Sequence, residues 1–128
     1  MTARELELRR FIFESFAATG EPPVVDDQTT LGELERRHVV VVRDGRVHMA
    51  HPFAGHHDGA SVTAPDGRRW WGNCAWDALG IVAALGLSDA DIDSGGVRLR
   101  VVGGQVVDDP LFHVAVPASR WWDDIEFT

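Results

Sequence analysis

The spacing of apolar residues in the first part of the chain predicts two helices. Between Arg4 and Ala18 the apolar side chains recur about every 3.6 residues, which is typical of an amphipathic helix. The run Gly20-Glu21-Pro22-Pro23 should end it. The run Thr30-Leu31-Gly32-Glu33 has the Thr-x-x-Glu form of a capping box, so a short second helix is predicted to reach about Arg37.

A hairpin is predicted directly after these helices. Two apolar runs, residues 39–42 and 46–50, flank Arg43-Asp44-Gly45, and Asp-Gly between apolar runs favours a tight turn. Two helices followed by a hairpin indicate a small winged-helix-like unit over residues 1–50. Winged helices often bind DNA, but the charge pattern of residues 29–37 is that of an ordinary solvated helix face.

The stretch from Arg68 to Gly86 predicts a strand, a turn and the central helix of the remaining chain. Arg68 to Trp71 follows the turn Pro65-Asp66-Gly67, and a helix should begin near Cys74 with Asn73 as its N-cap. Apolar residues at helical spacing then continue up to Gly86.

Short strands are predicted on both sides of this helix. They cover residues 61–64, 97–102, 105–107 and 112–116, while the acidic run 88–96 is expected to be a polar connector. The predicted fold class is therefore α+β. The small winged-helix-like unit, residues 1–50, should pack on residues 51–128, a small, mostly antiparallel sheet with one central helix.

Composition and charge narrow the possible classes of protein. A chain of 128 residues with 45% hydrophobic content fits one globular domain, and a net charge of −8 disfavours free nucleic acid as a partner. No apolar run approaches the roughly 20 residues of a membrane span, and Met1–Arg10 is too charged for a signal peptide. A single cysteine fits a reducing compartment, so we expect a cytoplasmic protein without membrane association.

The pair Cys74 and Asp77 is the main candidate for chemistry. A cysteine in the first turn of a helix faces unpaired N–H groups, which favour its thiolate as a nucleophile or metal ligand. Asp77, three residues later, should share its helix face and could accept and donate a proton. Cys-x-x-Asp can thus bind a soft atom and move a proton, although a lone cysteine is more often a small buried residue.

Tryptophans and histidines surround this motif in the sequence. Five tryptophans occur as Trp70-Trp71, Trp76 and Trp121-Trp122, and in a strand one of each pair can enter the core while the other lies at the surface. Those near Cys74 could also form an apolar wall around a hydrophobic ligand. His56 and His57 lack the spacing of a recognised metal site and are expected to be solvent-exposed loop residues.

The segment Gly67–Ile81, GRRWWGNCAWDALGI, resembles the active-site segment of the alkylmercury (organomercurial) lyases, in which Gly-Arg, an aromatic residue and Cys-Ala-x-Asp-Ala-Leu recur. His51-Pro52-Phe53 stands where that family has an aromatic residue, Pro and Phe after its wing hairpin. Trp121 to Thr128 resembles the segment that leads to the family's second cysteine. The resemblance covers nearly the whole chain.

The resemblance implies a lyase that cleaves a carbon–mercury bond by protonolysis. Cys74 would be the mercury-binding thiolate and Asp77 the proton donor, with a hydrocarbon and Hg(II) as products and no cofactor. Mercury is a soft ion and thiolate a soft ligand, so this agrees with the residue chemistry. The residues expected around a small hydrophobic organomercurial are Phe53, Trp71, Asn73 and Trp76.

One departure from the family pattern keeps alternatives open. The family's second mercury-binding cysteine would fall at or just past Thr128, so an external small thiol or a second copy of the chain in a homodimer would have to supply that sulfur. Asn73 stands where an aromatic residue is more usual. The alternatives are a relative with other thiol chemistry or soft-metal binding without turnover, and a structural or regulatory winged-helix protein with a buried Cys74.

Overall fold

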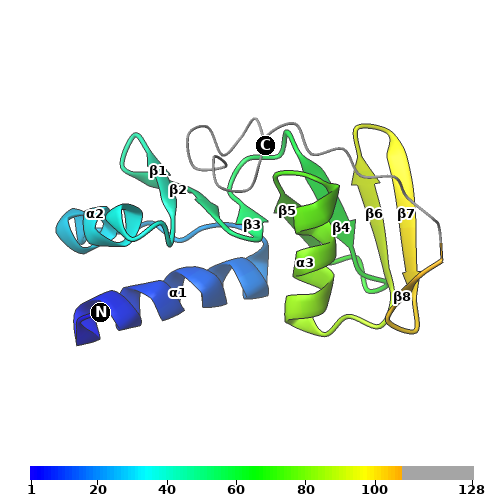
Figure 1. Ribbon diagram of the computed structural model, residues 1–128, viewed down its shortest axis with the longest axis horizontal. Helices are drawn as coiled ribbons and strands as arrows, with labels where there is room; N and C mark the ends of the chain where they lie inside the picture. Colours follow the sequence, from blue (N-terminus) through cyan, green and yellow to red (C-terminus); the bar gives the residue numbers. More distant parts are fainter. Residues whose placement is uncertain (108–128) are drawn as a thin grey trace.

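The computed structural model of the protein describes residues 1–107, and these residues have the predicted α+β architecture (Figure 1). The predicted strand at 112–116 and Trp121-Trp122 lie outside the described residues. The helices and strands in chain order are α1 (Ala3–Thr19), α2 (Gln28–Arg36), β1 (Val41–Arg43), β2 (Arg46–Ala50), β3 (Phe53–Ala54), β4 (Ala60–Thr63), β5 (Arg69–Gly72), α3 (Ala75–Leu85), β6 (Ala90–Ser94), β7 (Val97–Val102) and β8 (Gln105–Val106).

Helix α1 follows the prediction, and its C-terminal end is fixed against β5. Gly20 adopts a left-handed conformation with φ of 76° and donates its N–H to the carbonyl of Phe16 at 2.8 Å. A Cβ at position 20 would lie 2.3 Å from the carbonyl oxygen of Arg69, so only glycine allows this approach. The buried face of α1 includes Ile12 and Phe16.

Helix α2 begins earlier than the capping-box pattern predicts. Its N-cap is Asp27, whose Oδ1 accepts from the backbone N–H of Thr30 at 3.0 Å. The hydroxyl of Thr30 donates to Oδ2 of the same carboxylate at 2.6 Å. The prediction that Thr30 starts the helix was therefore wrong, because an acidic side chain three residues earlier satisfies the orphan N–H groups instead.

The hairpin β1–β2 forms at Asp-Gly as predicted. Asp44 and Gly45 have φ values of 52° and 74°, the positive values that a type I′ turn requires. The short strand β3, which the sequence pattern did not indicate, adds to β2 and completes a three-stranded antiparallel sheet. The winged-helix description and the boundary at residue 50 stay predictions.

The second sheet has five antiparallel strands in the order β5-β4-β6-β7-β8. The acidic run expected to be a connector contains β6, the central strand. It forms a strand because Ala90 and Ile92 alternate with Asp91 and Asp93, so the apolar pair enters the core and the acids face outward. On β7, Arg98 and Arg100 are exposed as predicted.

Helix α3 covers one face of this sheet, as Figure 1 shows. Trp70, Val62, Ile92 and Leu99 stand side by side in register on four adjacent strands and are all buried. Trp70 also donates its indole N–H to the carbonyl of Ala17 at 2.9 Å, which ties β5 to α1. The core therefore fixes the strand that leads directly into the Cys-x-x-Asp motif.

Among the helices of residues 1–107, none is both long and apolar enough to span a bilayer.

Candidate functional site

The Cys-x-x-Asp motif lies at the N-terminal end of α3. Cys74 itself, not Asn73, is the N-cap residue, with extended backbone angles (φ −151°, ψ 176°) and no hydrogen bond from its side chain to the first turn. Its carbonyl accepts the helical bond from the N–H of Ala78 at 3.0 Å. The predicted N-cap was therefore one residue too early, and the Cys74 side chain lies at the N-terminal end of α3.

Asp77 is buried in the first turn of α3, where glycine at position 72 makes room for it. A Cβ on Gly72 would lie 3.0 Å from Cβ of Asp77 and 3.2 Å from the carbonyl oxygen of Pro52. A Cβ on Gly80 would likewise lie 3.2 Å from Cβ of Pro52. Residues without side chains thus allow β5, α3 and the turn before β3 to converge on one carboxylate.

His51 is the partner of that carboxylate. Its Nδ1 lies 3.0 Å from Oδ1 of Asp77, and the His51 side chain is 62% exposed whereas that of Asp77 is 11% exposed. The hydrogen bond to Asp77 raises the pKa of His51, burial opposes this, and the negative charge of Asp77 adds to the increase. The pair joins a buried acid to an imidazole that reaches solvent.

The thiol of Cys74 is half-buried, and its pKa is raised rather than lowered. Burial is the main cause, and the charge of Asp77 also raises the pKa. The backbone N–H groups of Asp77 and Trp76 oppose this increase, although neither donates a hydrogen bond of normal geometry to the sulfur. The N–H groups of the helix terminus therefore act on the thiol in the expected direction, but burial and the neighbouring carboxylate outweigh them.

Of the four residues predicted to surround a substrate, two lie close to Cys74 in the chain and two make contacts elsewhere. Asn73 and Trp76 flank the thiol in the chain, and Trp76 is 60% exposed. Phe53 is buried and stacks on Phe16 with ring centroids 5.3 Å apart. Trp71 and Gly72 are adjacent in β5, so their side-chain positions point to opposite faces of the sheet. The ring of Trp71 therefore lies on the other face from Asp77.

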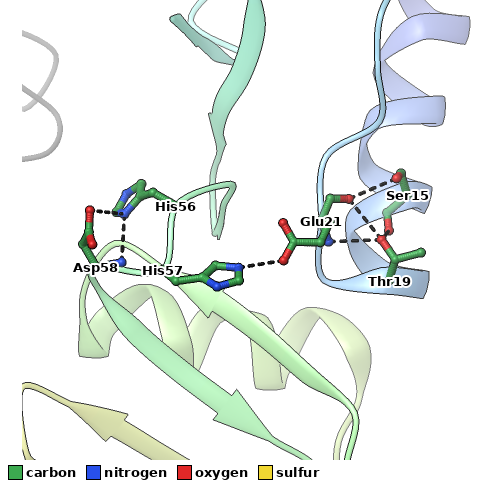
Figure 2. Close-up of polar contacts among 6 residues, drawn as sticks. All are labelled: Ser15, Thr19, Glu21, His56, His57 and Asp58. Atoms are coloured by element: carbon green, nitrogen blue, oxygen red, sulfur yellow. Dashed lines mark hydrogen bonds and ion pairs between the residues drawn. The ribbon is translucent and has the colours of Figure 1, made fainter.

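Trp71 and the histidine loop link this strand to the end of α1. The ring of Trp71 stacks on His57 at a centroid distance of 4.3 Å, and His57 Nε2 lies 2.6 Å from Oε1 of Glu21. Figure 2 shows Glu21 held in turn by Ser15 and Thr19.

His56, next to His57 in this loop, is not solvent-exposed as the sequence predicted. The side chain of His56 is only 14% exposed, and its ring stacks on His48 with centroids 4.7 Å apart. The expectation of a solvent-exposed residue was therefore wrong for His56. Across residues 1–107, no group of three or more His, Cys, Asp or Glu side chains is placed to hold a metal ion.

Sequence reasoning missed His51 and Gly72 as parts of the site. His51 stands in His51-Pro52-Phe53, but no spacing rule connects the turn between β2 and β3 with a residue of α3 that lies 26 positions later. Gly72 stands between the predicted strand, which ends at Trp71, and the predicted helix, and only the packing reveals that its missing side chain admits Asp77.

A family model described as alkylmercury lyase (MerB) matches residues 56–126, more than half of the chain. The match includes Cys74 and Asp77, while His51 lies just before it. No curated protein and no solved structure matches the chain.

Proposed function

The chain belongs to the alkylmercury lyase family, and from this we propose that it cleaves carbon–mercury bonds by protonolysis, with Cys74 as mercury-binding thiolate and Asp77 as proton donor. The observation that carries the proposal is the placement of a buried carboxylate one helical turn from a half-buried thiol within the matched segment. A soft thiolate suits mercury, and a positioned carboxyl group suits proton transfer to carbon.

The first step is exchange of thiols on mercury. In a medium rich in thiols an organomercurial carries a small thiolate, and the Cys74 sulfur replaces it, while the Cys74 proton leaves with the displaced thiol. Burial keeps Cys74 protonated at neutral pH, because its pKa is raised. Binding of mercury supplies the driving force for loss of this proton, since a metal-bound thiol is deprotonated.

The second step breaks the carbon–mercury bond. The carboxyl proton of Asp77 passes to the carbon, the bonding electron pair stays with that carbon, and the hydrocarbon leaves. Hg(II) remains on the Cys74 sulfur. Two small thiols then remove it as a dithiolate; one of their protons returns to the Cys74 sulfur and the other goes to solvent. The reaction therefore needs no resident cofactor, and its co-reactant is a small thiol.

The organic group of the substrate needs an apolar surface beside the sulfur. Trp76, exposed and two residues from Cys74, offers an aromatic face for an aryl or alkyl group. Asn73 offers a polar amide on the other side of the thiol in the chain. Trp71 and Phe53 support the strand and the turn that carry the site through their contacts with His57 and Phe16.

The direct test is release of hydrocarbon from an aryl- or alkylmercurial in excess small thiol. Wild type should release the hydrocarbon, Cys74→Ser should abolish release, and Asp77→Asn should lower the rate by at least about 100-fold. Asp91→Asn is the matched control, because Asp91 is exposed on β6 and pairs with Arg100 instead. Release that survives Cys74→Ser would sink the assignment.

A second candidate, capture of a soft metal ion without turnover, is favoured by the single cysteine of the sequence. The same experiment distinguishes the two functions. Stoichiometric binding of the mercurial to Cys74 with no hydrocarbon would identify a binding protein that retains the ligand and lacks the reaction.

A further inference from the structure

Asp77 needs a second group that returns a proton to it after each turnover. Each turnover leaves Asp77 as a carboxylate, and the proton of Cys74 has already left with the displaced thiol. The Asp77 side chain is 11% exposed, so its direct exchange with solvent is restricted. Multiple turnovers therefore require a path by which a proton from solvent reaches this carboxylate.

We propose that His51 is the proton relay of the site: its imidazole takes a proton from solvent and passes it through Nδ1 to Oδ1 of Asp77. This inference rests on the proposed lyase function and adds to it the residue that reloads the acid. His51 acts through Asp77 and not on the substrate, so it is a positioning and relay residue.

The geometry of the pair meets the requirements of a relay. The Nδ1–Oδ1 distance of 3.0 Å allows direct proton transfer, and the two side chains differ in exposure, 62% against 11%. In the part of the chain that the structure describes, Asp77 is the only carboxylate with an oxygen within 4 Å of a ring nitrogen of His51. The neighbouring titratable group on α3 is Cys74, whose thiol is half-buried.

Two further observations support the relay. Gly72 and Gly80 admit the His51-Pro52 turn against α3, so the imidazole is held at the carboxylate by backbone packing and not by a flexible side chain alone. The raised pKa of His51 keeps the imidazolium populated closer to neutral pH, where a relay has to accept protons.

The relay balances over one cycle. Asp77 gives its proton to the departing carbon and becomes a carboxylate; imidazolium His51 then gives its Nδ1 proton to Asp77 and becomes neutral. Neutral His51 accepts a proton from water or buffer and returns to imidazolium. No electrons are exchanged, and the proton consumed from solvent is the one found in the hydrocarbon.

The decisive variant is His51→Asn, because the asparagine amide can still donate to Asp77 near the position of Nδ1 but cannot carry a proton. We expect its steady-state rate of hydrocarbon release to fall by on the order of tenfold, less than the ~100-fold or more of losing the acid itself. The matched control is His38→Asn, an exposed histidine with positive φ that asparagine tolerates.

Two readouts separate a relay from a structural role. Added imidazole should restore most of the steady-state rate of His51→Asn and leave His38→Asn unchanged. The wild-type rate should fall as pH rises through the raised pKa of His51, and this fall should vanish in His51→Asn. If wild type is active and His51→Asn has the same rate and the same pH profile, the relay is overturned. The lyase function would remain.

An NMR titration of the His51 ring tests the pair without any turnover. Its pKa should lie above that of an ordinary histidine in wild type and should drop in Asp77→Asn. An unshifted His51 in wild type would overturn the relay. If the wild-type His51 pKa is raised but the protein releases no hydrocarbon, the proposed lyase function fails. The His51–Asp77 pair would then have no catalytic role.

Discussion

Gly72 lies directly against Asp77, and the hydrogen in place of a side chain is what lets the carboxylate enter the site. A Cβ at position 72 would approach Cβ of Asp77 to 3.0 Å, the amide nitrogen of Ala78 to 3.2 Å and the carbonyl oxygen of Pro52 to 3.2 Å. Two of these three neighbours belong to the backbone, so they can yield only by moving α3 or the turn before β3. The first turn of α3 therefore depends on this glycine.

We expect Gly72→Ala to reduce both stability and hydrocarbon release. Overpacking of this kind typically costs about 1–3 kcal/mol of unfolding free energy. The rate should fall further than stability explains, because Asp77 and His51 would be pushed apart. Urea unfolding and turnover measured on the same sample separate the two effects. Gly32→Ala on α2 is the control: its Cβ would meet nothing within 4 Å, so stability should rise by up to about 1 kcal/mol.

The sequence predicts helices and turns well where a local rule decides them. Asp44-Gly45 adopts positive φ values because a two-residue hairpin turn requires them, and Gly20 ends α1 for the same conformational reason. Strand β6 was interpreted as a connector because its acidic residues suggest a loop. Only the pairing with β4 and β7 reveals that every second residue is buried.

The candidate site was predictable only in part, for a physical reason. Cys74 and Asp77 are one helical turn apart, so their proximity follows from chain geometry. His51 and Gly72 reach Asp77 through tertiary packing, about which spacing along the chain carries no information. The pKa of Cys74 likewise depends on burial, which the helix-terminus argument does not include.

Removing the charge of Asp77 should make Cys74 more acidic. Asp77 raises the pKa of the thiol through its charge, so Asp77→Asn should shift the pH dependence of alkylation by iodoacetamide to lower pH. At about pH 8, below the usual thiol pKa of ~8.5, the variant should react a few times faster than wild type. Asp91→Asn should react like wild type. An unchanged profile in Asp77→Asn would show that burial alone controls the thiol.

The His51–Asp77 pair should contribute stability that depends on pH. The pKa of His51 is raised in the folded state, so this contribution is fully present below the unfolded value of ~6.5 and is lost as pH rises through the folded pKa. Urea unfolding of wild type and His51→Asn should therefore differ more at about pH 5.5 than at about pH 8.5. The extra difference should stay below about 1 kcal/mol, because the exposed imidazole is screened by solvent.

The same measurement in an Asp77→Asn background identifies the source of this pH dependence. Without the carboxylate, His51→Asn should have the same effect on unfolding free energy at both pH values. A pH-dependent difference that persists in this background would mean that another group raises the pKa of His51.

The same substitution should have very different effects on stability at two tryptophans beside the site. Trp70 is buried and donates its indole N–H to Ala17, so Trp70→Phe leaves a cavity and an unpaired carbonyl and should cost about 2–4 kcal/mol. Trp76 is 60% exposed, and Trp76→Phe should change stability by less than about 0.5 kcal/mol. If Trp76 contacts the organic group, its variant should raise the KM for an arylmercurial more than for methylmercury, because a larger aromatic face is lost. Equal KM values for wild type and Trp76→Phe with both substrates would remove Trp76 from the binding surface.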